Sequence, residues 1–195
     1  KRARTMDRLV TRSLSMNKIN IGCGWRNFGD DWIHIDGGDY KHLDYNDIAN
    51  LSQFADNSME LVYASHVIEY FDRQQVIPLL TEWKRVLKPY GVLRLAVPNF
   101  PVLAQLYLSR KIDLDKVLGP LYGKMTMGSE TIYHKTTYDF YSLKKLLSDL
   151  DFCNIRKYDW RKTEHAQFDD HSQAYIPHMD KINGRLISLN VECLK

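Results

Sequence analysis

Residues 20–36 decide the fold of this chain and read Asn-Ile-Gly-Cys-Gly-Trp-Arg-Asn-Phe-Gly-Asp-Asp-Trp-Ile-His-Ile-Asp. A short apolar run around Ile21 breaks into Gly22 and Gly24, and a second apolar run ends at Asp36. Glycine lets a backbone bend sharply and approach a ligand closely, because it carries no Cβ atom. A carboxylate at the tip of the neighbouring strand accepts hydrogen bonds from the hydroxyl groups of a ribose. This combination predicts the adenosine-binding half of an open α/β sheet.

Two classes of adenosine cofactor share these features, dinucleotides and S-adenosylmethionine, and the glycine spacing separates them. The dinucleotide fingerprint is Gly-x-Gly-x-x-Gly, with a pyrophosphate bound at the N-terminus of the helix that follows. Here Asn27 occupies the third glycine position, and Gly29 is out of register. Only seven residues separate Gly24 from Trp32, fewer than a crossover helix needs. The segment therefore favours a methyl donor over a dinucleotide.

Length and composition indicate one globular domain. The chain has 195 residues, 44% of them hydrophobic, which is enough for a sizeable core. No apolar run approaches the ~20 residues of a membrane span. The three cysteines are widely spaced, which predicts free thiols and a cytoplasmic location. Because the chain begins with Lys1 and not with methionine, we expect a processed chain or a domain cut from a longer protein.

Positive charge is concentrated at the N-terminus. The formal net charge is +3, and residues 1–12 alone hold five basic residues against one aspartate. Such an arm is suited to contact nucleic acid or an anionic membrane, and the alternative is a solvated segment with a short amphipathic helix. We favour the alternative, because no basic patch with interleaved aromatic residues follows. Residues 1–16 are thus predicted to form a basic arm and helix, without a nucleic-acid partner.

Apolar runs alternate with helical patterns along the chain, which predicts an α/β sheet with helices on both faces. A helix is predicted over 73–87, ended by Pro89 and Gly91. Thr137 is the predicted N-cap of a second helix through Asp149. Seven strands are predicted, over Lys18–Ile21, Trp32–Asp36, His42–Tyr45, Leu61–Ala64, Gly91–Val97, Asn154–Tyr158 and Leu186–Glu192.

Two long irregular stretches, 98–136 and 159–184, interrupt this pattern. Insertions of this size between a strand and a helix are often lids or substrate walls, so 99–136 is predicted to be a lid-like insertion. The last two strands follow each other without a helical pattern between them, so a right-handed parallel crossover is not available. We therefore predict that the last strand runs antiparallel and lies beside the strand at 91–97.

A second signal lies at the end of another apolar strand. Residues 56–71 read Asp-Asn-Ser-Met-Glu-Leu-Val-Tyr-Ala-Ser-His-Val-Ile-Glu-Tyr-Phe, so the strand exits into Ser65 and His66 and a short helix begins at once. With the glycine turn and with Leu-Lys-Pro-Tyr-Gly-Val-Leu-Arg-Leu-Ala-Val-Pro-Asn at 87–99, this order of motifs closely resembles class I S-adenosylmethionine-dependent methyltransferases of the "type 11" kind. The resemblance covers nearly the whole chain. It implies one Rossmann-like domain over 1–195, with a seven-stranded, mostly parallel sheet in the order 3-2-1-4-5-7-6.

The resemblance also implies S-adenosyl-L-methionine as cofactor, with S-adenosyl-L-homocysteine as product. The glycine turn would flank the methionine part, an aspartate would bind the ribose, an Asp-Ile pair would meet the adenine, and the Ser-His pair would sit beside the sulfonium. The short first crossover departs from the family pattern, as does Tyr90, where a second glycine is common. The implied cofactor-binding residues are Gly22, Cys23, Gly24, Asp36, Asp47, Ile48, Ser65 and His66.

Each of these residues also has a purely structural interpretation. The glycines would then only permit a tight turn, and Asp36 would cap a strand. Asp47 would cap the next helix, which makes it the weakest of the cofactor predictions. His66 would be a helix-start histidine without a ligand.

A third region, residues 164–178, gathers three histidines, two adjacent carboxylates and two aromatic residues in one loop. Methyl transfer to a hydroxyl group needs a base near the acceptor oxygen, and a His–Asp pair supplies one. The predicted catalytic residues are His165, favoured as the base, with Asp169, Asp170 and His171. The alternatives are that the carboxylates hold Mg²⁺, which we do not favour, or that the loop is structural. No zinc site is predicted, because no thiolate lies nearby.

This loop and the strand at 186–192 look like a methyltransferase subgroup associated with polysaccharide and surface-glycan synthesis, an inference by analogy. It implies a sugar or glycan acceptor, and fusion to or association with glycosyltransferases. The chain is accordingly predicted to O-methylate a sugar hydroxyl of a glycan or nucleotide-sugar. The alternatives are small-molecule N- or C-methylation and a non-catalytic cofactor-binding module of a larger protein.

Overall fold

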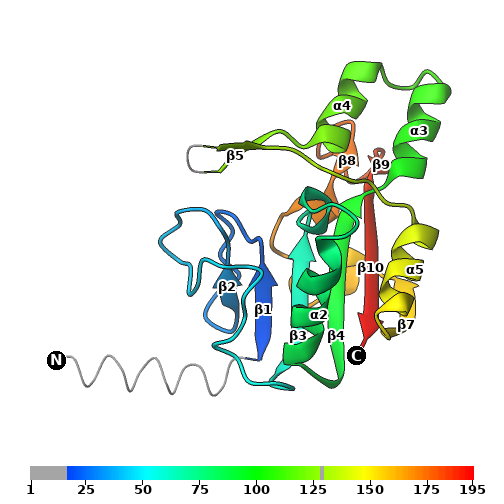
Figure 1. Ribbon diagram of the computed structural model, residues 1–195. Helices are drawn as coiled ribbons and strands as arrows, with labels where there is room; N and C mark the ends of the chain where they lie inside the picture. The colour runs from blue at the N-terminus through cyan, green and yellow to red at the C-terminus, as the bar shows by residue number, and fades with distance from the viewer. Residues whose placement is uncertain (1–16, 128–129) are drawn as a thin grey trace.

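The computed structural model describes residues 17–127 and 130–195, which build a mixed sheet (Figure 1). The main sheet has six strands in the order β2-β1-β3-β4-β10-β7. Strands β1 to β4 are parallel, whereas β10 is antiparallel to both of its neighbours, β4 and β7. The predicted antiparallel last strand, beside the strand at 91–97, is thus confirmed. The six strands are β1 (Lys18–Ile21), β2 (Ile33–Ile35), β3 (Met59–Ser65), β4 (Leu87–Pro98), β7 (Cys153–Lys157) and β10 (Ser188–Leu194).

The strand predicted at His42–Tyr45 is not formed, and only an isolated bridge joins Ile35 to Tyr45 at this edge. The Asp44 carboxylate accepts a hydrogen bond from the backbone N–H of His34 at 2.9 Å. The carbonyl of His34 accepts from the backbone N–H groups of Asp44 and Tyr45. A side chain therefore occupies the place where a further strand would extend the ladder. The prediction of seven strands in the order 3-2-1-4-5-7-6 is wrong for this reason.

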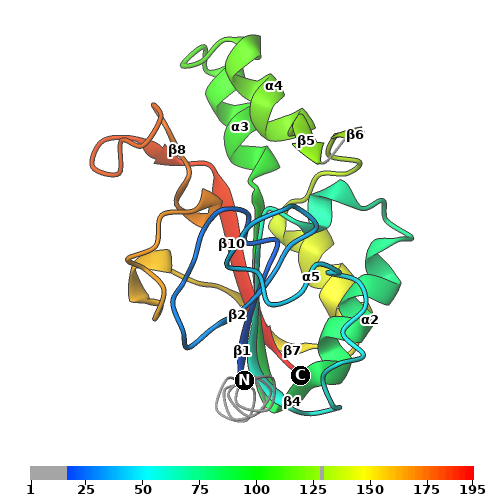
Figure 2. The ribbon, with the colours of Figure 1, turned by 90° about the vertical axis from the view of Figure 1, so that its left-hand side faces the viewer.

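The two long helices of the sheet region lie on one face, where α2 (Val76–Val86) and α5 (Phe140–Asp149) pack side by side (Figure 2). The opposite face is covered by irregular chain that includes the 3-10 turns η2 (Trp160–Lys162) and η3 (His171–Gln173). The prediction of helices on both faces is therefore wrong. The first crossover is too short to hold a helix, and the 159–184 stretch lacks a helical apolar period.

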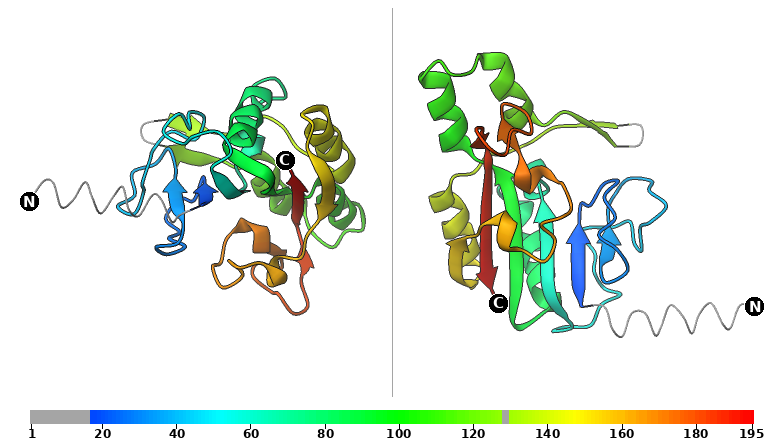
Figure 3. Two further views of the ribbon diagram at one scale, coloured as in Figure 1. Left: turned by 90° about the horizontal axis from the view of Figure 1, so that it is seen from below. Right: turned by 180° about the vertical axis from the view of Figure 1, so that it is seen from behind.

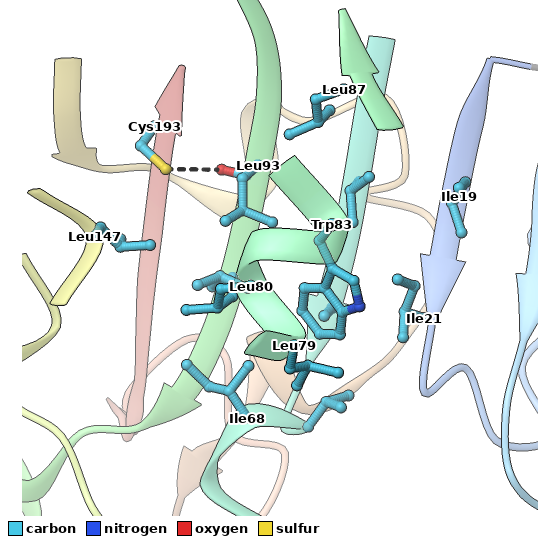
Figure 4. Packing of buried hydrophobic residues seen from close by; sticks show 14 of the residues in the cluster. Ile19, Ile21, Ile68, Leu79, Leu80, Trp83, Leu87, Leu93, Leu147 and Cys193 are labelled. Carbon is cyan, nitrogen blue, oxygen red and sulfur yellow. Dashed lines mark hydrogen bonds between the residues drawn. The ribbon is translucent and has the colours of Figure 1, made fainter. Parts of the chain in front are cut away.

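Alternate residues of β3 point into two separate cores, as the two-residue period of a strand requires. Val62 and Ala64 belong to the main core under α2 and α5, whereas Leu61 and Tyr63 belong to an aromatic cluster on the other face. Trp83 of α2 is fully buried in the main core (Figure 4). Its indole N–H donates to the backbone carbonyl of Ile48 at 2.8 Å. This bond fixes the segment after β2 against the core.

Both predicted helices begin later than expected. The first starts at Val76, and β4 follows it directly at Leu87. The second starts at Phe140, because Asp139 and not Thr137 caps it. Asp139 and Ser142 form a reciprocal capping box, in which each side chain accepts a hydrogen bond from the other's backbone N–H. The predicted basic arm at 1–16 lies outside the described residues.

The insertion at 99–136 stands above the carboxyl ends of the parallel strands, as the view from behind shows (Figure 3, right). It packs through a third apolar cluster that includes Leu103, Val117 and Ile187. The β5–β6 ribbon of this insertion reaches back to the turn after β2, where the Met127 sulfur lies against Gly37. The elements around this end of the sheet are η1 (Ile68–Tyr70), α3 (Phe100–Leu108), α4 (Leu114–Tyr122), β5 (Met125–Met127), β6 (Glu130–Ile132), β8 (Tyr175–Ile176) and β9 (Arg185–Leu186).

Candidate active site

A cleft of about 2200 Å³ opens where the carboxyl ends of β1, β2 and β3 meet the 99–136 insertion and the 169–187 segment. In open α/β sheets ligands bind at this edge, because the loops that leave parallel strands converge there. Seven of the eight predicted cofactor-binding residues line the cleft, and the exception is Cys23. The Cys23 side chain is buried beside His42, and burial raises the pKa of its thiol to about 12.

The turn after β1 requires glycine for two reasons. Gly22 and Gly24 have φ angles of +67° and +56°, in the left-handed region that other residues adopt at a cost. A Cβ atom at Gly22 would also lie 2.2 Å from Cγ2 of Val67, far inside contact distance. The backbone N–H of Gly22 donates to the carbonyl of Ile35 at 2.7 Å, which ties the turn to the end of β2.

We expect Gly22→Ala to destabilise the protein by about 2–5 kcal/mol, from the left-handed backbone together with the clash against Val67. Urea unfolding should show a lower midpoint with an unchanged slope. Gly119→Ala is the matched control, because no atom lies within 4 Å of the added Cβ there. It should leave the midpoint unchanged or raise it. Equal midpoints for Gly22→Ala and the wild type would contradict this account of the turn.

Asp36 organises the glycine turn from the end of β2. Its carboxylate accepts from the backbone N–H of Gly24 and from that of Gly38, each at 2.7 Å and each on a different oxygen. The carboxyl group is mostly buried and lines the cleft. Because each carboxylate oxygen can accept a second hydrogen bond, a ribose with two hydroxyl groups fits this position. The residues present therefore suit the predicted cofactor.

Asp47 and Ile48 lie on the same wall, on the segment after β2. The Asp47 carboxylate accepts from the backbone N–H groups of Ala49 and Asn50, at 2.9 and 3.1 Å. These bonds cap a turn, as the structural interpretation of this residue expects. Its role at the adenine stays a prediction. Ile48 presents an aliphatic side chain at the cleft while packing against the main core.

The end of β3 brings two polar side chains to the cleft. Ser65 Oγ is buried and has no hydrogen-bond partner within the described residues. An unpaired buried hydroxyl at a cleft wall is suited to accept or donate to a ligand. His66 follows with φ +57°, a left-handed backbone that non-glycine residues rarely adopt outside functional or turn positions. Burial lowers the pKa of the His66 ring well below its usual value, so the ring is neutral at pH 7.

Glu69, which the sequence analysis did not single out, lies directly behind His66. Its carboxyl group is fully buried, and neither oxygen has a hydrogen-bond partner among the described residues. Oε1 lies 3.3 Å from Nδ1 of His66 and 3.9 Å from Nε2 of His134. Burial raises the pKa of Glu69 to about 8, so the group is mainly protonated at pH 7. A charged residue on the apolar face of the Val67–Phe71 segment was the signal that could have revealed it.

The tautomers of His66 and His134 follow from the hydrogen bonds that each ring makes on the side away from Glu69. Nδ1 of His134 lies 3.1 Å from the carbonyl of Pro120, to which only an N–H can donate, so Nε2 faces Glu69 as an acceptor. Nε2 of His66 lies 3.4 Å from the Ser188 hydroxyl, which itself donates to Asn190 at 2.7 Å. His66 therefore donates through Nε2 and offers Nδ1 to the Glu69 acid proton. The single acid proton of Glu69 can serve only one of these two acceptors, and the nearer one is Nδ1 of His66.

The structure does not bring His165, the favoured base, to the cleft. Its ring is buried on the opposite face of the sheet, 4.2 Å from the ring of Tyr63 and stacked on Phe28 at 5.6 Å. Both ring nitrogens lack hydrogen-bond partners in the described part of the chain, and burial lowers the ring's pKa to about 4. A base must reach the acceptor proton directly or through one water. This position suits a role in the aromatic cluster instead.

The two carboxylates of the loop line the cleft but already have partners. Asp170 accepts from the Tyr63 hydroxyl and from the backbone N–H of Ser172, and so caps η3. Asp169 pairs with Lys181 at 3.0 Å, and its backbone carbonyl accepts from the Arg26 guanidinium at 2.7 Å. The Arg26 bond ties the loop to the glycine turn. Both aspartates therefore hold the loop in place.

His171 is the predicted catalytic residue that the structure brings into the cleft with a free side chain. It is exposed, lines the cleft, and makes no side-chain hydrogen bond within the described residues. Its ring centroid lies 5.3 Å from that of His66. Desolvation at the cleft wall, with Arg26 nearby, lowers its pKa, so the ring is neutral at pH 7 and able to accept a proton.

No group of three His, Cys, Asp or Glu side chains within residues 17–127 and 130–195 is arranged to hold a metal ion. Within the same residues, no helix is long and apolar enough to cross a membrane.

Comparison with known proteins links this geometry to one kind of protein. A family model described as a methyltransferase domain matches residues 32–95, which hold β2, β3, η1, α2 and most of β4. The match includes Asp36, Ser65 and His66 but not the glycine turn. None of the curated proteins matches the sequence.

Solved structures share the fold over almost the whole chain. An S-adenosylmethionine-dependent methyltransferase from Archaeoglobus fulgidus is 15% identical with a TM-score of 0.54, over 98% of this chain and 92% of that one. Another, from Methanosarcina mazei, is 18% identical with a TM-score of 0.54, over 96% of each chain. A third, from Mesorhizobium loti, is 15% identical with a TM-score of 0.51, over 98% and 96%. The family match over residues 32–95 and the shared fold make the chain similar to S-adenosylmethionine-dependent methyltransferases, and the residues at the strand ends suit S-adenosylmethionine as the cofactor.

Proposed function

We propose that the protein is an S-adenosylmethionine-dependent methyltransferase that transfers the methyl group to a sugar hydroxyl of a glycan or nucleotide-sugar, with His171 as the general base. The observation that supports this proposal most directly is the free, neutral His171 ring in the cleft, beside His66. S-adenosylmethionine, when bound, supplies a methyl group already activated by the sulfonium charge. The main chemical task left to the protein is to remove the acceptor proton.

The chain holds the donor at the strand ends. The backbone around Gly22 and Gly24 would receive the methionine part, and Asp36 the ribose hydroxyls. Ser65 Oγ, buried without a partner among the described residues, is available to the donor in the same wall. A neutral His66 fits next to a sulfonium, because a protonated ring would repel that cation.

The acceptor oxygen would be aligned between His171 and the donor. Arg26, through the Asp169 carbonyl, and Tyr63, through the Asp170 carboxylate, hold the loop before η3 in position. Positioning of this kind supplies much of the acceleration in a displacement between two bound partners. Asp170 is thus proposed as a positioning residue and not as the base.

Other side chains that line the cleft are of the kinds that bind sugars by ring stacking and hydrogen bonds. Trp25 offers a ring face, while Asn183 and Gln105 offer amide groups for hydroxyls. The Trp25 ring is 69% exposed and is covered on one side by the Arg26 guanidinium at 4.8 Å. A flat, exposed ring in a cleft is suited to stack on a sugar. The proposed role in glycan synthesis, with glycosyltransferases as partners, rests on this composition and on the resemblance of the 164–192 sequence.

The donor site is tested by titrating S-adenosylhomocysteine in a calorimeter. We expect Asp36→Ala to weaken binding at least tenfold, about 1.4 kcal/mol, because two ribose hydrogen bonds are lost. Asp39→Ala is the control, since Asp39 is an exposed aspartate of the same wall. Equal affinities for the wild type and Asp36→Ala would contradict the assignment of Asp36 to the ribose. Binding of NAD in place of S-adenosylhomocysteine would contradict the assignment of the donor.

The acceptor is tested by incubating the enzyme with a pool of glycans and nucleotide-sugars and with the methyl donor. Mass spectrometry should show a species heavier by one methyl group only when enzyme and donor are both present. Alkaline stability of the new ether distinguishes O-methylation from an ester. Donor binding without any turnover across sugar, amine and carbon acceptors would instead favour the non-catalytic module.

A further inference from the structure

The walls of the cleft differ in charge. The donor wall, residues 22–71, presents three carboxylates against the single cation of Arg26. The wall from the 99–136 insertion presents four lysines against the single carboxylate of Asp113. We call this second wall the lysine wall, defined by Lys111, Lys116, Lys124 and Lys135. The sulfonium cation of the donor matches the acidic wall, which leaves the lysine wall for the acceptor.

Among the described residues, no carboxylate forms a hydrogen bond or ion pair with the lysine wall. Lys111, Lys116 and Lys124 make no side-chain hydrogen bond or ion pair with the described residues, and Lys135 donates to the neutral amide of Gln75 at 3.0 Å. Other lysines in the chain do find carboxylates, as Lys145 does with Asp149 at 2.6 Å. Lys111, Lys116 and Lys124 are therefore without a paired carboxylate in the described part of the chain, whereas Asp72 acts on Lys135 at longer range.

The 169–187 segment forms a third wall of the cleft and also presents a cation there. Arg185 of β9 also lines the cleft, is exposed, and makes no side-chain bond within the part of the chain that the structure describes. Asp169, on the same segment, is neutralised by Lys181, and the Asp170 carboxylate is bonded to the Tyr63 hydroxyl and the Ser172 N–H. A cleft wall that presents charges of one sign attracts the part of a ligand that carries the opposite charge. Lysine is a common ligand for phosphate, as a point charge with three donors.

We propose that the acceptor is anionic, and that its phosphate or carboxylate group docks on Lys111, Lys116 and Lys124 while its hydroxyl faces His171. This inference rests on the proposed function, of which it names the substrate class. The charge has two sources among sugars: the diphosphate of a nucleotide-sugar, or the carboxylate of an acidic sugar unit. A neutral sugar would leave the lysine wall without a counter-charge.

The test uses two probes, inorganic pyrophosphate and glucuronate, titrated into the protein saturated with S-adenosylhomocysteine. The variant is Lys111→Glu combined with Lys116→Glu, and the matched control is Lys144→Glu combined with Lys162→Glu, two exposed lysines outside the cleft. We expect at least one probe to bind, and its affinity to fall at least tenfold in the variant but not in the control. Binding should also weaken as salt concentration rises.

The outcomes separate the two proposals. Pyrophosphate binding alone supports a nucleotide-sugar, and glucuronate binding alone supports an acidic sugar. Failure of both probes to bind, or equal affinity in the Lys111/Lys116 variant and the wild type, overturns the anionic acceptor. Failure of S-adenosylhomocysteine to bind the wild type would overturn the proposed function instead. Unchanged S-adenosylhomocysteine affinity in the variant shows that the donor site and fold are intact.

Discussion

Replacing His171 with alanine is expected to lower kcat by a factor of roughly 10²–10⁴ while S-adenosylhomocysteine still binds. The reason is position: the ring lies in the cleft, beside His66, and has no side-chain partner among the described residues. The measurement is turnover of the acceptor found by mass spectrometry, with the affinity for S-adenosylhomocysteine measured on the same samples.

The pH profile adds a second readout. A general base works only when unprotonated, so kcat should fall as pH drops through the pKa of His171. Because the cleft wall and Arg26 lower this pKa, the fall should lie below the ordinary value of about 6.5. In His171→Ala this acid limb should disappear along with most of the rate.

His165→Phe is the matched control for His171→Ala, because it keeps an aromatic ring in the cluster with Tyr63 and Phe28. It should retain near-normal kcat. Loss of turnover in His165→Phe with normal turnover in His171→Ala would restore His165 as the base. Normal turnover in both would place the base elsewhere, with His66 as the reserve candidate.

Glu69→Gln is expected to make the protein more stable than the wild type at alkaline pH. The carboxyl group has a pKa of about 8 in the folded protein and an ordinary value of 4.5 when unfolded. The folded state therefore holds a proton that the unfolded state releases, and its stability is lost as pH rises from about 4.5 to about 8. A shift of this size corresponds to up to about 5 kcal/mol. Glutamine stays neutral and keeps the shape of the protonated acid.

Urea unfolding at pH 5 and at pH 8.5 measures this effect. The free energy of unfolding should fall with pH more steeply in the wild type than in Glu69→Gln, and the gap between the two should be larger at pH 8.5. His66 and His134 face this carboxyl group, and burial lowers the pKa of each, but both are present in wild type and variant, so the comparison between the two proteins isolates the effect of Glu69. Glu130→Gln, at an exposed site, should follow the wild type. Parallel curves for wild type and Glu69→Gln would show that Glu69 is ionised in the fold.

The donor end of the site could be predicted from the sequence because its features are local. A glycine turn follows β1, Asp36 follows β2, and Ser65 ends β3 with His66 directly after it. Parallel strands place their carboxyl ends at one edge of the sheet, so these side chains converge once the strands pair. The antiparallel last strand was predictable for the same kind of reason, since no helix was available to return the chain.

The acceptor end was decided by tertiary structure, because its loops have no period that fixes where a side chain points. Five residues separate His165 from His171, yet the first is buried against Tyr63 and the second lines the cleft. A cap formed by Asp170, with the Tyr63 hydroxyl donating to it, turns the chain between them. The missing strand at 42–45 has a similar cause, since Asp44 takes the N–H that the strand would have used.

The sequence by itself determined the cofactor class and the strand ends that carry it, because backbone geometry and residue type act there over a few residues. Only the tertiary structure decided which histidine reaches the cleft, that Glu69 stays buried behind His66, and that the lysines of the insertion face the donor wall. Burial, desolvation and the meeting of charges depend on segments far apart in the chain, and no local pattern encodes them.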